Sequence, residues 1–96
     1  MATYITLLKW THQGVANVKD SPKRLDLGRE AFKKYGVEIK DTYLVMGRYD
    51  LVCVIEGPDD ETVARALLTL GSQGNVQTET LTAFTEAQFR KITALI

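Results

Sequence analysis

The chain has 96 residues, a length that provides for one hydrophobic core and therefore for a single domain spanning residues 1–96. Apolar residues make up 45% of the chain and charged residues 25%, which is the composition of an ordinary soluble domain. Twelve basic and twelve acidic residues give a formal net charge of zero, and this balance excludes the basic surplus expected of a nucleic-acid-binding protein.

Membrane, export and metal signals are weak. No stretch approaches the roughly 18 apolar residues of a membrane helix, and the first residues lack the basic and apolar segments of an export signal. The single cysteine, Cys53, excludes an internal disulfide, and the single histidine, His12, would need carboxylates or symmetry-related copies to complete a zinc site. We therefore expect a cytoplasmic protein with no metal and no cofactor.

The first predicted element is a strand over residues 3–10, which are rich in β-branched and aromatic side chains. Both of its alternating faces are apolar, which is typical of a strand inside a sheet: Ile5 and Leu7 lie on one face, and Tyr4, Leu8 and Trp10 on the other. Residues 11–20 have the composition of a loop.

A helix is predicted to follow, with Ser21 as its N-cap and Pro22 at its first position. Apolar residues continue at helical spacing until Gly36, a glycine of the kind that ends helices. Gly28 falls in mid-helix, where glycine costs about 1 kcal/mol relative to alanine. Close packing of the helix on a sheet is the simplest explanation for it.

Two further strands are predicted to form a hairpin around Gly47-Arg48. Residues 37–46 alternate, with Val37, Ile39, Tyr43 and Val45 on one face, as expected of a half-exposed edge strand. Residues 49–56 carry apolar groups on both faces and are expected inside the sheet.

The remaining elements are a helix, a strand and a tail helix. Asp60 ends a turn and opens the second helix, which Gly71 closes. Residues 76–84 alternate with threonines and predict the fourth strand. Thr85 and Gln88 form a capping box that opens a short helix with apolar residues near the C-terminus.

This order predicts an α+β, ferredoxin-like βαββαβ fold with an extra short C-terminal helix. Right-handed crossovers place two helices on one face of a four-stranded antiparallel sheet, with the first and third strands in its centre. The other face is expected to carry Tyr4, Leu8, Trp10, Leu44, Val52 and Val54. Such an apolar face predicts self-association into a homo-oligomer, or a cover formed by the tail helix.

The residues around the predicted hairpin resemble a known family. Gly47, Tyr49 and Asp50, with Arg48 between the first two, are similar to the signature of the GYD-domain family. Other segments that resemble this family are residues 11–14 (THQG), 19–22 (KDSP) with Arg24, 58–60 (PDD), 74–76 (GNV) and 78–85 (TETLTAFT). The resemblance implies a ferredoxin-like fold that forms oligomers, and it implies no reaction.

A looser resemblance links residues 47–51 and 78–80 to the effector domain of Lrp/AsnC regulators. That resemblance implies paired subunits, in the form of a dimeric α/β barrel, that bind amino acids between them. We expect no DNA-binding helix-turn-helix ahead of this domain. Small dimeric monooxygenases that use neither metal nor flavin are similar in architecture only.

The candidate site lies where the first strand ends and the third begins. The topology brings His12 and Asp50 toward one another there, and the polar residues Gln13, Lys19, Arg24, Arg48 and Tyr49 are the other candidate ligand-binding residues. Asp50 has two interpretations, as a cap for backbone N–H groups or as a ligand-facing acid. His12 is either an ordinary loop residue or a proton-transfer group, and the Arg48 guanidinium suits a carboxylate ligand.

Three functions are compatible with these features. The first is an oligomeric module that binds a small anionic or hydrophobic molecule at a cleft between subunits. The second is a cofactor-independent enzyme of the dimeric-barrel kind, monooxygenase- or isomerase-like, with His12 and Asp50 as its acid and base. The third is a structural assembly without a ligand. No nucleic-acid or membrane partner is expected.

Overall fold

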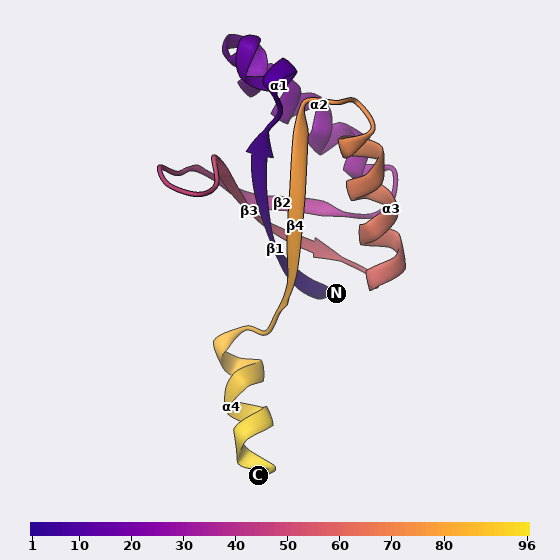
Figure 1. The fold of residues 1–96 in the computed structure, drawn as a ribbon. Coiled ribbons are helices and arrows are strands. Elements are labelled where there is room, and N and C mark those ends of the chain that lie inside the picture. Colours follow the sequence, from indigo (N-terminus) through magenta and orange to yellow (C-terminus); the bar gives the residue numbers. More distant parts are fainter.

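The computed structural model describes all residues, 1–96. The strands form one antiparallel sheet in the order β2-β3-β1-β4, and α2 and α3 pack on the same face of it (Figure 1). This confirms the predicted ferredoxin-like fold with β1 and β3 in the centre. The elements are β1 (Ala2–Trp10), α1 (His12–Ala16), the 3-10 helix η1 (Val18–Asp20), α2 (Ser21–Lys33), β2 (Glu38–Leu44), β3 (Leu51–Gly57), α3 (Asp60–Gly71), β4 (Val76–Ala83) and α4 (Glu86–Ala94).

The core lies between the sheet and the two helices. The register of β1 with β3 corrects the predicted assignment of residues to the two sheet faces. Tyr4 of β1 stands opposite Ile55 of β3, and Leu8 stands opposite Leu51. Directly opposed residues share a face, so Tyr4, Leu8 and Trp10 face the helices and not the open side. Among the residues predicted for the open face, only Val52 and Val54 belong to it. The buried core consists of Tyr4, Leu8, Phe32, Val37, Cys53, Ile55, Val63 and Ala66.

A β-bulge explains why the predicted face of Leu44 is also wrong. The pairing of β2 with β3 shifts between Ile39 and Asp41, so one extra residue interrupts the alternation. Leu44 then lies opposite Leu51 on the helix side, whereas Tyr43 lies opposite Val52 on the open side. The predicted common face of Ile39 and Tyr43 is therefore wrong.

The segment predicted as a loop, residues 11–20, is largely helical. Thr11 is the N-cap of α1, and its Oγ1 accepts a hydrogen bond from the Gly14 N–H at 3.1 Å. The 3-10 helix η1 runs directly into α2, so Ser21 already has helical dihedral angles and Asp20 occupies the N-cap position. The predicted N-cap role of Ser21 is therefore wrong. At the other end, Gly36 follows α2 with a φ of 74°, as predicted for a terminating glycine.

Tyr4 links the core to the start of α3. Its hydroxyl donates a hydrogen bond to Asp60 Oδ1, and this bond, followed by burial, raises the pKa of Tyr4 to about 12. Because the folded-state pKa lies above the ordinary value of 10.0, the stabilisation is complete below pH 10 and is lost as the pH rises through about 12.

Tyr4→Phe is expected to lower the free energy of unfolding at pH 7 by about 1.5 kcal/mol, because the hydrogen bond to a carboxylate is lost. The variant should also lose less stability than the parent chain on going from pH 9 to about 12. Urea unfolding at a series of pH values measures both effects. Equal pH profiles for the two proteins would contradict this role for the hydroxyl.

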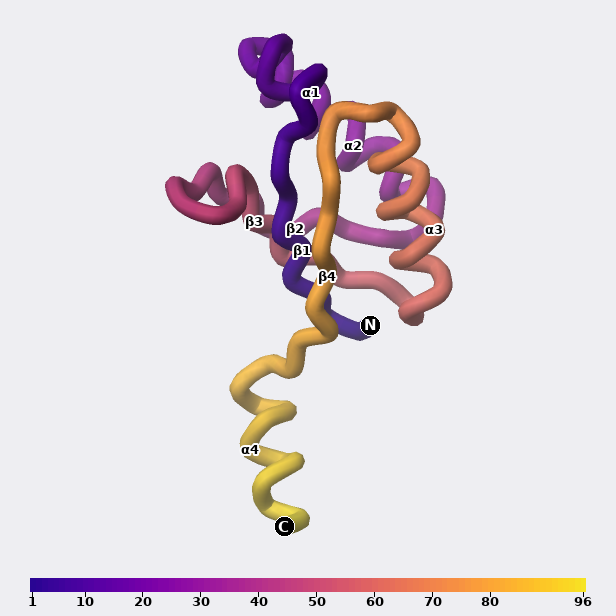
Figure 2. The backbone as a smooth tube through the Cα atoms, viewed as in Figure 1, coloured from indigo at the N-terminus to yellow at the C-terminus, as the bar shows by residue number.

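The tail helix α4 stands apart from the sheet. The predicted capping box is confirmed, since Thr85 and Gln88 each bond the other's backbone N–H. The helix extends away from the domain, and none of its residues is buried (Figures 1 and 2). It therefore does not cover the open sheet face of its own subunit, and its apolar residues Phe89, Ile92, Leu95 and Ile96 are exposed.

Candidate functional site

The end of β1 is fixed to the turn between α3 and β4. The Thr11 N–H donates to the Asn75 carbonyl oxygen at 3.0 Å, and the Thr11 hydroxyl donates to the Gly74 carbonyl oxygen at 2.5 Å. Gln13 adds bonds from its Nε2 to the Gln73 carbonyl oxygen at 3.3 Å and to Asn75 Oδ1 at 3.1 Å. The buried Gly14 packs directly against the same turn, and no larger residue fits there, because a Cβ would lie 2.0 Å from the Asn75 carbonyl oxygen.

Arg24 fixes the same corner from the side of α2. Its Nη1 donates to the Asn17 carbonyl oxygen at 2.9 Å, and its Nη2 donates to the Gly14 carbonyl oxygen at 3.2 Å. Arg24 takes part in none of the chain's ion pairs. The half-buried Arg24 side chain therefore holds α1 and η1 in place, and its positive charge has no carboxylate partner.

Asp50 joins the hairpin loop to the end of β1. Its Oδ2 accepts a hydrogen bond from the Trp10 backbone N–H, and its own N–H donates to the Leu8 carbonyl oxygen, both at 2.9 Å. Its carbonyl oxygen accepts from the Val45 N–H at 2.9 Å. The loop covers residues 45–50 and is longer than the short turn predicted at Gly47-Arg48, with Gly47 at a φ of 146°.

Asp50→Ala is expected to lower the free energy of unfolding by about 1–3 kcal/mol, because the Trp10 N–H at the end of β1 loses its acceptor. Asp50→Asn keeps an acceptor oxygen, so it should lower the free energy of unfolding by less. Asp41→Ala, at an exposed position of β2, is the matched control. Urea unfolding measures all of these, and an Asp50→Ala midpoint equal to that of the control would exclude the capping role.

The other predicted site residues lie on different sides of this corner. The Tyr49 hydroxyl donates to Glu79 Oε1 at 2.8 Å, and this bond raises the pKa of Tyr49. Arg48, His12 and Lys19 are exposed, in the hairpin loop, α1 and η1 respectively. No hydrogen bond or ion pair joins His12 to Asp50, whose carboxylate is bonded to Trp10. The ligand-binding role of these residues stays a prediction.

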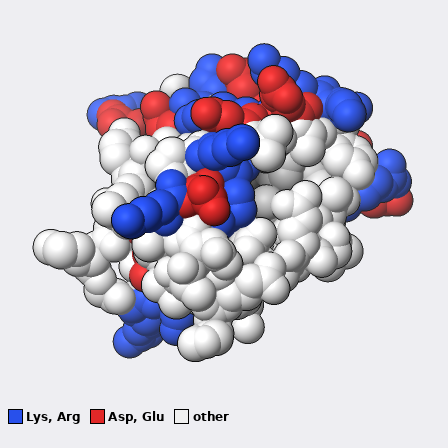
Figure 3. Space-filling model, turned by 90° about the horizontal axis from the view of Figure 1, so that it is seen from above, with Lys and Arg blue, Asp and Glu red and all other residues white.

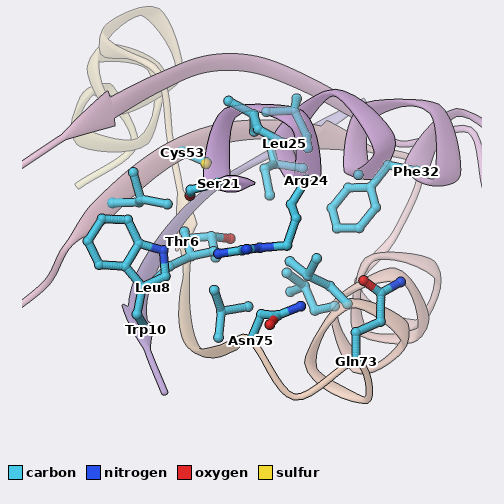
Figure 4. A pocket seen from close by; sticks show the side chains of 17 residues that line it. Thr6, Leu8, Trp10, Ser21, Arg24, Leu25, Phe32, Cys53, Gln73 and Asn75 are labelled. Carbon is cyan, nitrogen blue, oxygen red and sulfur yellow. The ribbon is translucent and has the colours of Figure 1, made fainter. Parts of the chain in front are cut away.

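Between α2, α3 and the sheet lies an apolar cavity of about 60 Å³ (Figure 4). The polar side chains of its lining come from Thr6, Trp10, Ser21, Arg24, Cys53, Gln73 and Asn75. A larger groove of about 310 Å³ adjoins it between the start of α2 and β2. The cavity and the groove share the walls formed by Trp10, Ser21, Leu25 and Leu51.

The sequence-based prediction included Arg24 but missed the cavity and its Trp10. The cause is the face assignment of β1, which places Trp10 on the open side. One feature of the sequence could have indicated the cavity, namely Gly28, a glycine in the middle of a helix. A Cβ at Gly28 would meet no atom within 4 Å, so close packing on the sheet is not the reason for it. Gly28 instead lines the cavity.

The surface charges form no single-sign region in the view from above (Figure 3). Lys and Arg lie among Asp and Glu, beside a broad uncharged surface. No group of three or more His, Cys, Asp or Glu side chains is placed to hold a metal ion. Every helix is too short or too polar to cross a membrane.

Comparison with known proteins identifies the family of the chain. The GYD domain, as a family, matches residues 4–93. The chain belongs to the GYD-domain family. A relative from Thermus thermophilus is 40% identical over 84 residues, which are 86% of this chain and 88% of that protein. That relative is named glutamine synthetase and cystathionine beta-lyase binding protein.

Solved structures resemble this GYD domain over most of its length. Protein TTHA0845 of Thermus thermophilus is 26% identical, with a TM-score of 0.55 over 88% of this chain and 95% of that one. The hypothetical protein PHS023 of Pyrococcus horikoshii is 22% identical, with a TM-score of 0.59 over 90% of this chain and 93% of that one. MtbAldR is 10% identical, with a TM-score of 0.70 over 88% of this chain and 52% of that one. The last two likenesses concern the fold alone.

The signature residues of this GYD domain have distinct structural contacts. Gly47 supplies a positive φ in the hairpin loop. Tyr49 reaches Glu79 of β4, and Asp50 reaches the backbone of β1. The trio thus ties the hairpin loop to the two strands that follow β3 in the sheet order.

Proposed function

We propose that this GYD domain is a homo-oligomeric binding protein that associates with metabolic enzymes and has no reaction of its own. The observation that carries the proposal is the open face of the sheet. Opposed pairs place Ile5 and Leu7 of β1 beside Val54 and Val52 of β3, and Leu81 of β4 stands opposite Ile5. We call the set Ile5, Leu7, Tyr43, Val52, Val54 and Leu81 the open-face patch.

The open-face patch is expected to be covered by a second copy. It has at least one apolar residue from each of the four strands, with Asp41 and Glu79 at its two edges, and neither α2 nor α3 lies on it. Tyr43 is 58% exposed and Leu81 is 47% exposed, so the surface is accessible in the single subunit. A contiguous apolar face on a small domain is typical of an interface. The exposed apolar side of α4 supports the same inference, since it too lacks a cover in its own subunit.

The proposed enzyme partners rest on the relative from Thermus thermophilus, whose name states that it binds glutamine synthetase and cystathionine beta-lyase. Since that relative and this chain match over most of both lengths, a protein-binding role is the nearest function to transfer. We infer that this chain binds one or both of the corresponding enzymes of its own organism.

A more specific part of the proposal is that a small ligand binds in a cleft between subunits. Tyr49 reaches Glu79, the residue opposite Leu7, and so the hairpin loop lies at the end of the open-face patch. In an oligomer that pairs these patches, Arg48 and Tyr49 would stand at the border between copies. A small anion held by Arg48 there would suit this location.

Two rival functions make different predictions. An enzyme using His12 and Asp50 would need the pair to act together, and the Asp50 carboxylate instead accepts the Trp10 N–H. A purely structural assembly would bind neither enzyme nor ligand. The contacts of Asp50 favour the binding protein over the enzyme.

The test uses the purified chain with purified glutamine synthetase and cystathionine β-lyase from the same organism. Light scattering after size exclusion should give a mass above that of one 10.7 kDa chain, and biolayer interferometry should detect saturable binding to at least one enzyme. A monomer at micromolar concentration would refute the oligomer. Absence of binding to both enzymes at tens of micromolar would refute the proposed partners.

A further inference from the structure

An unsatisfied donor marks the cavity under α2. The Trp10 indole Nε1 is buried and has no hydrogen-bond partner. A buried N–H without an acceptor costs about 1–3 kcal/mol, so such groups generally have a partner. Trp10 lines both the cavity and the adjoining groove, and an acceptor in that space would satisfy it.

A second donor faces the same space. The Arg24 guanidinium points across the cavity toward the indole N–H in the close view (Figure 4). Arg24 is the only charged residue that lines either the cavity or the groove, and it has no carboxylate partner. A cation and a neutral donor that converge in a half-buried site favour an anionic acceptor.

The apolar walls of the cavity determine which ligand body would fit. Leu8, Leu25, Phe32, Leu67 and Leu70 are among the apolar side chains around the cavity. The inner space of about 60 Å³ suits only a short chain or part of a ring, and the groove of about 310 Å³ provides room for the remainder. The site therefore fits a small molecule with one anionic end and a compact apolar body.

We propose that the cavity of each subunit binds a small monocarboxylate with an aliphatic or aromatic body, through the Trp10 indole N–H and the Arg24 guanidinium. The inference deepens the proposed binding role by naming a ligand class, but it places the site within one subunit. Because no acidic residue lines the cavity or the groove, an ammonium group has no anionic partner there. The site should thus prefer a simple carboxylic acid to the amino acid with the same side chain.

Gly28 supports the proposal that a ligand occupies the cavity. A glycine in mid-helix lowers stability, and a Cβ here would meet no atom. The sequence therefore leaves open a part of the cavity wall that alanine could fill without a clash.

The chain contains one tryptophan, so its indole N–H gives one resolved signal in a ¹⁵N–¹H NMR spectrum. The probes are 4-methylpentanoate, leucine and 4-methylpentan-1-ol, which share one aliphatic body. We expect 4-methylpentanoate to move the indole signal in a saturable way. Leucine and the alcohol should bind at least about tenfold more weakly, since the ammonium of leucine has no anionic partner in the site and the alcohol lacks the negative charge.

Variants separate binding from folding. Trp10→Phe keeps an aromatic ring but removes the donor, and Arg24→Gln removes the charge. Each should weaken 4-methylpentanoate binding about tenfold or more by calorimetry, and Arg24→Lys should recover part of the loss. Gly28→Leu should block the site by filling it. Arg65→Gln, on the exposed side of α3, is the matched control and should bind as the parent chain does.

Several outcomes would overturn the proposal. They are an unmoved indole signal at 10 mM 4-methylpentanoate, equal binding of the three probes, and full affinity in a folded Trp10→Phe or Arg24→Gln variant. The first of these would mean that water alone satisfies the indole. The oligomer and enzyme-binding measurements use other surfaces, so they can succeed when this site fails, and the reverse holds as well.

Discussion

Val54→Lys is expected to convert the oligomer into monomers. Val54 lies on β3 within the open-face patch, between Ile5 of β1 and Asp41 of β2. In a single subunit the lysine can extend into water beside Asp41, so the fold should persist. In an oligomer the ammonium would lose its water at the interface, and this desolvation costs several kcal/mol even for a charge that lies beside a carboxylate such as Asp41. The dissociation constant should therefore rise at least about a hundredfold.

Light scattering at concentrations from 1 to 100 µM measures this change, and circular dichroism checks the fold. Val15→Lys is the matched control, because Val15 is 49% exposed on α1 and lies outside the sheet. That variant should keep the parent mass. An unchanged mass for a folded Val54→Lys protein would show that the open-face patch is not the interface.

Gly14→Ala is expected to lower the free energy of unfolding by about 3 kcal/mol, in the upper part of the range for overpacking. The new Cβ would lie 2.0 Å from the Asn75 carbonyl oxygen. That oxygen belongs to the backbone and already accepts the Thr11 N–H, so it cannot move aside without breaking the bond. Separation of α1 from the α3–β4 turn is the expected result.

Gly28→Ala is the matched control for this change and should change the free energy of unfolding in the opposite direction. Its Cβ would enter open space within α2, so alanine should raise the free energy of unfolding by about 0.5–1 kcal/mol through helix propensity. Urea unfolding of both variants gives the comparison. Equal effects at Gly14 and Gly28 would show that helix propensity, and not the contact with Asn75, determines the cost.

Local sequence determined the elements and several of their ends. The period of apolar residues predicted the strands and main helices, because each side-chain pattern must match a repeat of two or about 3.6 residues. The capping box at Thr85 and Gln88 and the terminating Gly36 rest on bonds within a few residues, and both were predicted correctly. The strand and helix order, with right-handed crossovers, was enough to predict the strand order of the sheet and the packing of both main helices on one of its faces.

Tertiary structure alone decided which side of each strand is covered. Both faces of β1 are apolar, so alternation separates Tyr4 and Leu8 from Ile5 and Leu7 without showing which pair meets the helices. That choice depends on the register with β3, a contact between residues about fifty positions apart. The bulge after Ile39 reversed the faces of β2 for a similar reason, because an inserted residue leaves no local signal. Trp10, Arg24 and Gly28 consequently became a common cavity wall only when α2 was packed on the sheet.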